Sequence, residues 1–211
     1  MPLLKTLRDL FALCSVISLV GFTNLAHGQG VEITSVRTMG SGCHYTDVGS
    51  TIHESGEGFT LIFDNFLVES TKGERRKNCL VKVNMMAEGN WQYAFVGIDY
   101  RGYAFLGEQA KLTMKSLYKT KRGWYRYLGK KRIQGPFDDN FSQSYEIPGR
   151  KLRWSRCYAG KSYSSFKVLT KFKLRGKDSF ASIDSLDGAI PSLSGEESPS
   201  QNFRIIKRRC R

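Results

Sequence analysis

The sequence predicts an all-β protein, a two-sheet antiparallel β-sandwich or jelly roll stapled by disulfide bonds. Hydrophobic and polar residues alternate with a period of two in many short segments, which is typical of half-buried strands. Turn-forming residues separate these segments, and no long stretch shows the 3.6-residue hydrophobic period of a helix. Roughly ten short strands with this spacing favour a sandwich or jelly roll.

The alternation is clearest in residues 166–174, where Phe166, Val168 and Phe172 oppose a series of lysines. The predicted strands are 31–37, 59–63, 80–86, 91–95, 103–106, 111–118, 125–133, 151–154, 166–174 and 203–208. Turn signals separate them at 54–58, 88–90, 122–123 and 135–136. Asp138, Asp139 and Asn140 lack the spacing of a calcium loop and are interpreted as an acidic turn.

The first 28 residues have the three parts of a cleavable signal peptide. Lys5 and Arg8 form a basic region, and the thirteen-residue apolar stretch 10–22 is too short to cross a bilayer of about 30 Å. The small residues Ala26 and Gly28 place the cleavage before Gln29. We therefore expect export by a signal peptide, so that the protein is secreted or lies in the periplasm or cell envelope.

The remaining residues, 29–211, are long enough for one β-sandwich domain. One segment breaks the strand pattern: residues 178–201 are rich in serine, glycine and acidic residues and contain no lysine or arginine. They predict a long acidic, serine-rich loop before the final strand.

Four cysteines remain after removal of Cys14 with the signal peptide. An even number outside the cytoplasm predicts two disulfides. Four cysteines allow three connectivities, and we favour Cys43–Cys79 with Cys157–Cys210 because each closes a loop of moderate length. The spacing gives no zinc motif, so we expect no metal site, and no motif calls for a cofactor.

The formal net charge is +14, and removal of the two basic and one acidic residues in 1–28 leaves +13. Such a basic protein favours anionic partners such as acidic polysaccharide, lipopolysaccharide, lipid head groups, cell-wall polymers or nucleic acid. The alternative is a charge suited only to solubility in a particular milieu.

One basic cluster interleaves cations with aromatic rings, a combination that binds polyanions and sugar rings. We predict an anion-binding surface from its members, which are Lys119, Lys121, Arg122, Trp124, Tyr125, Arg126, Tyr127, Lys130, Lys131 and Arg132. A hairpin around Gly123 would display many of them together. The alternative is that cations on edge strands only prevent aggregation between sheets.

The sequence favours a non-enzymatic protein. It has no GxSxG nucleophile elbow, no phosphate-binding glycine loop and no dinucleotide motif. A lyase-like enzyme acting on acidic glycans remains an alternative; it would use His44 or His53 together with Tyr100 and Arg101. A structural coat component is a third possibility.

Three cysteine-centred motifs appear in order: 40–43 (GSGC), 75–79 (RRKNC) and 154–157 (WSRC). Between them lie 63–66 (FDNF), 99–104 (DYRGYA) and 135–137 (GPF). This order over residues 31–174 resembles a family of small secreted proteins of bacteria and fungi, domain of unknown function 4360. The resemblance implies an exported, cysteine-containing β-protein and supplies no catalytic residues. His44 and Arg156 depart from the pattern, since proline is common at both positions.

Overall fold

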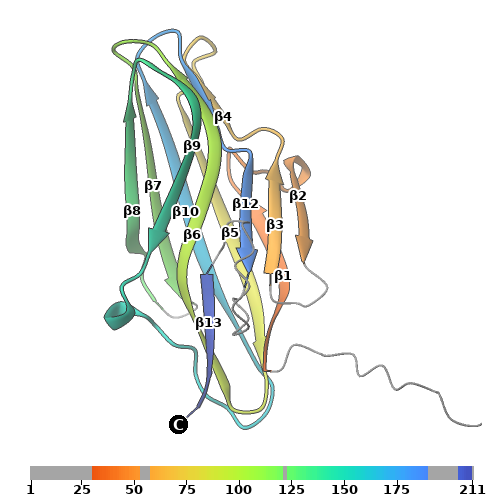
Figure 1. The fold of residues 1–211 in the computed structure, drawn as a ribbon. Coiled ribbons are helices and arrows are strands. Elements are labelled where there is room, and N and C mark those ends of the chain that lie inside the picture. The colour runs from red at the N-terminus through yellow and green to blue at the C-terminus, as the bar shows by residue number, and fades with distance from the viewer. Residues whose placement is uncertain (1–29, 53–57, 121–122, 190–203, 211) are drawn as a thin grey trace, which may run out of the picture.

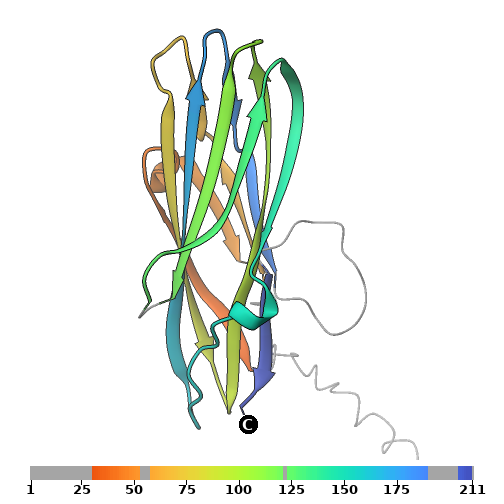
Figure 2. The ribbon, with the colours of Figure 1, turned by 90° about the vertical axis from the view of Figure 1, so that its left-hand side faces the viewer.

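The computed structural model describes residues 30–52, 58–120, 123–189 and 204–210. The predicted signal peptide, His53, Lys121, Arg122 and the second half of the predicted acidic loop lie outside these ranges. The described chain forms two β-sheets packed into an elongated sandwich (Figure 1, Figure 2). The prediction of an all-β, disulfide-bonded sandwich is therefore confirmed.

Five strands form the first sheet, here the five-stranded sheet, and all its pairings are antiparallel. In spatial order they are β1 (Val31–Met39), β5 (Arg76–Ala87), β10 (Ser162–Arg175), β7 (Lys111–Thr120) and β8 (Arg126–Gln134).

Eight strands form the second sheet, here the eight-stranded sheet, around the long strand β6. Along its main path the order is β2 (Val48–Ile52), β3 (Gly58–Phe63), β12 (Ser185–Ala189), β13 (Arg204–Arg209), β6 (Trp91–Leu106), β11 (Phe180–Ser182) and β4 (Leu67–Glu69). The other edge of β6 pairs with β9 (Phe137–Glu146). Two 3-10 turns, η1 (Tyr45–Asp47) and η2 (Gly149–Lys151), complete the elements.

The core lies between the sheets and follows the predicted alternation. In β10, Phe166, Phe172 and Leu174 are almost fully buried and face the other sheet. The ring of Phe166 stacks on Phe95 of β6 at 4.8 Å between centroids. Each large apolar side chain buried in this way contributes about 1.5–3 kcal/mol, so the alternating faces supply most of the drive to pack the sheets.

Both disulfides have the favoured connectivity, with Cys43 joined to Cys79 and Cys157 joined to Cys210. The first ties the segment after β1 to β5. The second ties the segment before β10 to the end of β13, at the end of the sandwich where β5 turns into β6 (Figure 1). It fastens the last described strand to the body.

Several predicted boundaries were wrong. Residues 91–95 and 103–106 belong to one continuous strand, β6, and residues 151–154 form no strand: η2 precedes Trp154, which makes a single bridge to Ala94. The predicted acidic turn at Asp138 lies inside β9. β9 was missed because only Phe141, Tyr145 and the half-buried Phe137 supply an apolar face.

The described part of the predicted acidic loop is also partly strand, since β11 and β12 fall within 178–189. Their short, polar sequences carry little strand signal, and they are ordered by pairing with β4, β6 and β3. Within the described ranges, no helix is long and apolar enough to span a membrane, and no three His, Cys, Asp or Glu side chains converge as metal ligands.

Candidate functional site

The positive charge of the protein is concentrated on one sheet. The strands of the five-stranded sheet contain fifteen basic residues and a single acidic residue, Glu32. Those of the eight-stranded sheet contain five basic and six acidic residues, so that sheet is close to neutral. The strands of the five-stranded sheet therefore carry most of the net positive charge of the chain.

Strand alternation turns most of these cations outward. In β7, for example, Leu112 and Met114 are buried, whereas Lys111, Lys115 and Lys119 point away from the core. We call the outward cations of this sheet the basic face. Its members are Arg37, Arg76, Lys82, Lys111, Lys115, Lys119, Lys130, Arg132, Lys167, Lys171, Lys173 and Arg175.

The strand register arranges the basic face in rows that cross the sheet. One row runs over four strands, from Arg37 to Lys82, Lys167 and Lys119 as directly opposed partners. Neighbouring strands are about 4.7–4.9 Å apart, so these like charges are close neighbours. Directly opposed like charges destabilise a sheet. The fold therefore maintains an arrangement that costs it stability.

A second row of lysines lies further along the strands, where Lys171, Lys115 and Lys130 are opposed across β10, β7 and β8. An apolar row separates the two, with Leu169 opposite Leu117. The basic face therefore alternates charged and apolar rows, which allows it to contact both the charges and the carbon skeleton of a ligand.

Among the described residues, no acidic side chain forms an ion pair with a cation of the basic face. Three ion pairs occur in the described part of the chain, Lys72–Glu69, Lys77–Glu74 and Lys161–Glu88, and none includes a member of this face.

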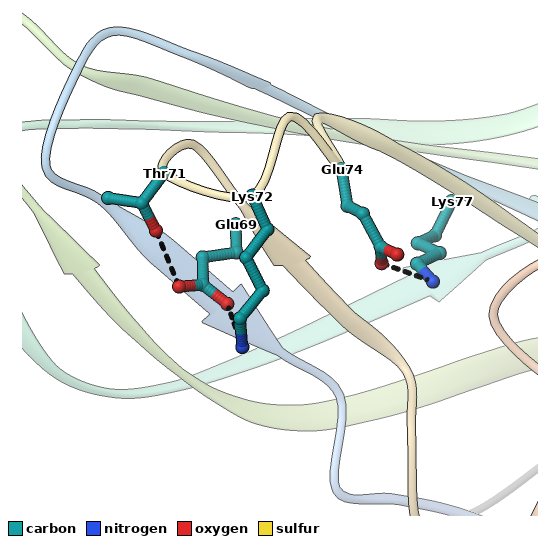
Figure 3. Close-up of polar contacts among 5 residues, drawn as sticks. All are labelled: Glu69, Thr71, Lys72, Glu74 and Lys77. Atoms are coloured by element: carbon teal, nitrogen blue, oxygen red, sulfur yellow. Dashed lines mark hydrogen bonds and ion pairs between the residues drawn. The ribbon is translucent and has the colours of Figure 1, made fainter.

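Figure 3 shows two of these pairs at the turn between β4 and β5, where Glu69 accepts bonds from Lys72 and Thr71. Glu74 lies 2.6 Å from the ammonium of Lys77. Lysines at this turn are thus neutralised, whereas those on the sheet are not.

Neighbouring positive charges lower the pKa of two lysines of the basic face. The neighbouring Arg175 and Arg76 lower the pKa of Lys173. Partial desolvation, followed by the charges of Arg132 and Lys115, lowers the pKa of Lys130. Both lysines respond to an excess of positive charge that an anionic ligand would relieve.

Aromatic rings accompany the cations at one edge of this face. The Lys119 ammonium lies 4.8 Å from the centre of the Tyr125 ring, and that of Lys115 lies 5.8 Å from the Tyr127 ring. The rings reach this position because a register shift between Ser116 and Leu117 changes the pairing of β7 with β8. The edge therefore presents both cations and ring faces to solvent.

The predicted binding cluster is only partly brought together. Lys119, Tyr127, Lys130 and Arg132 lie on the basic face, and Tyr125 adjoins it. Lys131 turns to the opposite side of β8 by alternation.

Trp124 and Arg126 line a pocket at the end of β7 together with Lys119, and Trp124 is 91% exposed. Sequence reasoning missed the cations of β1, β5 and β10, because residues far apart in the chain become neighbours only through strand pairing. The lysine alternation of 167–173 was the available signal.

Tyr100 and Arg101, two residues of the alternative lyase-like hypothesis, lie on opposite faces of β6. Tyr100 is fully buried between the sheets, and its hydroxyl lies 2.8 Å from the Ser116 hydroxyl and 2.5 Å from that of Thr170. Burial raises the pKa of Tyr100 to about 12. Arg101 is exposed on the opposite face of β6, so it cannot act beside this hydroxyl. His44 is exposed before η1 and contacts Thr46; His53 is outside the described ranges.

Residues 29–194 match the family model described as domain of unknown function (DUF4360). This chain belongs to the DUF4360 family. The match includes both strands of the long β5–β6 hairpin and three of the four disulfide-bonded cysteines. The predicted family membership is confirmed.

A curated relative of this DUF4360 protein is an uncharacterized secreted protein of Arthroderma benhamiae, 30% identical over 143 residues. The matched region covers 66% of the present chain and 58% of the relative. The chain thus spans little more than half of the length of that protein.

Solved structures with a partial likeness include carbohydrate-binding modules. TmCBM61 in complex with β-1,4-galactotriose has a TM-score of 0.27 and 11% identity, over 75% of this chain and 90% of that one. The mannan-recognising module TmCBM27 has a TM-score of 0.25 and 10% identity, over 75% and 88%. A family 11 module of Clostridium thermocellum has a TM-score of 0.21 and 10% identity, over 75% and 95%. Overlap this slight says nothing about the ligand of the DUF4360 protein.

Proposed function

We propose that this DUF4360 protein acts outside the cytoplasm as a non-enzymatic module that binds an anionic polymer through the basic face. The observation that carries this proposal is the row of directly opposed cations from Arg37 to Lys119, which has no acidic partner in the described chain. A sheet that needed cations only for solubility could intersperse acidic residues and avoid this repulsion. A bound polyanion supplies the missing countercharge.

The cysteines and the N-terminal segment support a location outside the cytoplasm. Disulfides persist in oxidising environments and are rare in the cytosol. The chain holds two, and residues 1–28 have the composition of a signal peptide. The relative from Arthroderma benhamiae is itself described as secreted. These features together support export.

An acidic polysaccharide is the polymer that best fits this surface. The charged rows lie on either side of an apolar row that includes Leu117 and Leu169, and Tyr127 borders it. Carboxylates of an extended chain can meet the cations while the carbon faces of its sugar rings cover the apolar row. Both contacts use outward side chains that the sheet already holds in place, so little ordering of the protein is needed on binding.

The test is binding of the purified protein to polygalacturonate, with neutral dextran as the control polymer, over a series of sodium chloride concentrations. We expect binding to polygalacturonate alone and a linear fall of log K with log salt. Each cation that contacts a polyanion contributes about 0.7–0.9 to that slope in nucleic-acid complexes, and we expect a similar scale here. Equal binding to dextran, or binding that is indifferent to salt, contradicts the proposal.

Two triple variants test whether the basic face is the surface that binds the polymer. Substitution of the row Lys115, Lys130 and Lys171 by glutamine removes three cations from the basic face, and we expect the slope to fall by roughly 2.

The matched control substitutes glutamine for Lys72, Lys151 and Lys161, which are exposed and lie outside the five-stranded sheet. Both triples lower the net charge equally. An equal loss of affinity in the two would mean that overall charge, not the basic face, governs binding.

A further inference from the structure

A pocket of about 280 Å³ lies at the end of the sandwich, near the Cys157–Cys210 disulfide. Its walls come from β6, from the beginning of β10, from the end of β7 and from the segment 153–158. This volume is near the lower end of small-ligand sites, so it suits one ring rather than a length of chain.

The segment 153–158 is held rigidly against β6 and β13. The Ser155 amide donates to the Tyr93 carbonyl at 2.7 Å, and the Tyr93 amide donates to the Ser155 hydroxyl at 3.1 Å. The Arg208 guanidinium lies 3.8 Å over the Trp154 ring, and the Cys157–Cys210 disulfide closes the end. The pocket wall is therefore preorganised, which reduces the entropy lost when a ligand binds.

The lining combines three kinds of group that together recognise an acidic sugar. Arg153 and Arg156 supply guanidinium groups, which pair with carboxylates in a bidentate fashion. Hydroxyls of serines and a threonine line the same wall and can exchange hydrogen bonds with sugar hydroxyls. Tyr158 and Tyr163 add exposed rings, 50% and 65% accessible, against which the carbon face of a sugar can pack.

One buried polar atom in this lining lacks a partner. Tyr93 is 5% exposed, and its hydroxyl has no hydrogen-bond partner among the described residues. Burial raises the pKa of Tyr93, an effect that the nearby Ser164 hydroxyl opposes without making a hydrogen bond of good geometry. A buried hydroxyl in this state costs stability unless a ligand or water satisfies it.

A second pocket, of about 370 Å³, adjoins the first, and Thr120 and Arg153 line both. It is lined further by Trp124, Arg126 and Lys119. Lys119 is also the last cation of the four-strand row of the basic face. The residues that line the two adjacent pockets therefore extend from the preorganised end of the sandwich to the basic face.

We propose that the pocket beside Arg153 and Arg156 binds a single carboxylate-bearing sugar, a uronate, at one end of an acidic polysaccharide. The carboxylate pairs with the guanidinium groups, the serines bind sugar hydroxyls, and the rest of the chain extends past Lys119 onto the basic face. This proposal deepens the proposed function and rests on it for the polymer, but the binding of the isolated sugar is a separate property.

The experiment follows ¹H–¹⁵N spectra of the purified protein during titration with free D-galacturonate, D-galactose or acetate. We expect galacturonate to shift the signals of the 153–158 segment and the Trp154 indole. We expect galactose and acetate to bind at least tenfold more weakly, since each offers only part of the recognised chemistry. The spectra of the unsubstituted protein give this answer without any variant.

Two double variants then assign the site. Substitution of Arg153 and Arg156 by glutamine is expected to weaken galacturonate binding at least tenfold. The control substitutes glutamine for Arg150 and Lys151, which are exposed in the neighbouring η2 turn, and is expected to leave binding unchanged. All four side chains are exposed, so both variants are expected to fold.

The outcomes separate the two proposals. The triple variant of Lys115, Lys130 and Lys171 is expected to lose polygalacturonate affinity while it keeps galacturonate binding. Polygalacturonate binding without any galacturonate binding, equal binding of galactose or acetate, or equal effects of the two double variants would overturn the pocket proposal and leave the basic face in place. Galacturonate binding at the pocket without binding of the polymer would overturn the basic face alone.

Discussion

The repulsion within the basic face predicts that one charge reversal increases the stability of the protein while it impairs binding. Lys167 is the best position because it is opposed by Lys82 on one side and by Lys119 on the other. The substitution Lys167→Glu converts two like-charged pairs into two oppositely charged pairs. Each cross-strand pair is worth roughly 0.2–1 kcal/mol, and solvent screening keeps exposed pairs toward the lower part of that range.

We therefore expect Lys167→Glu to raise the free energy of unfolding by about 1 kcal/mol at low salt. In a domain of this size that corresponds to an increase in Tm of roughly 2–4 °C. The Lys167→Gln variant removes the repulsion without adding attraction, and we expect about half of the gain. Urea unfolding and thermal melts at 10 mM and 1 M sodium chloride measure both, since screening at 1 M reduces the Debye length to about 3 Å.

A matched control is Lys72→Glu, which makes the same change of charge at a turn where Lys72 already pairs with Glu69. We expect this variant to be no more stable than the unsubstituted protein. The reasoning is refuted if Lys167→Glu gives no gain at low salt, if its gain is undiminished at 1 M salt, or if Lys72→Glu gains as much. Unchanged binding of polygalacturonate by Lys167→Glu would refute the role of this row.

Three further predictions concern the core and the framework. Between pH 10 and about pH 12 the free energy of unfolding is expected to fall, because the pKa of Tyr100 is raised to about 12 in the folded protein and the residue ionises more readily when unfolded. Absorbance at 295 nm follows the ionisation of tyrosine, and unfolding curves follow the stability. A free energy of unfolding that is unchanged from pH 9 to 12 contradicts this prediction. Replacement of Cys157 and Cys210 by serine is expected to lower the free energy of unfolding by about 4 kcal/mol, since the bridge closes a separation of 53 residues; urea unfolding measures this loss. The same variant is expected to lose galacturonate binding and to lose less of its polymer binding, which titration with each ligand measures. Gly102→Ala would place a Cβ 2.1 Å from a backbone carbonyl oxygen and is expected to lower the free energy of unfolding by about 1–3 kcal/mol or more. In the control Gly49→Ala the nearest atom is 3.9 Å from the new Cβ, and thermal melts are expected to show no comparable loss of stability.

Local sequence patterns were sufficient to predict the class of fold and the two disulfide bonds. The alternation in 166–174 predicted which residues of β10 enter the core, because side chains of a strand point to opposite faces in turn. The moderate loop lengths favoured the two disulfides that form. β9, β11 and β12 could not be predicted in the same way, since their order comes from hydrogen bonds to neighbouring strands rather than from their own composition.

The candidate site, too, was predicted only in part from the sequence. The cations and rings of 119–132 are neighbours in the sequence, so their local pattern predicted a binding edge, and Lys119 and Lys130 do lie on the basic face. The sequence does not reveal which face of β6 the opposite sheet covers, so it left Tyr100 as a member of the alternative lyase-like site. The burial of Tyr100 against Ser116 and Thr170 is a tertiary property.

By itself, the sequence determined an all-β protein with paired cysteines, a strongly basic composition and one cation-rich hairpin. Only the tertiary structure decided that Arg37, Lys82, Lys167 and Lys119 form one row, because these residues lie on four strands and meet through their register. It likewise decided that Thr120 and Arg153 line two adjacent pockets, one of which also includes Lys119. Charge composition is additive along a chain, whereas a charged surface depends on which strands become neighbours.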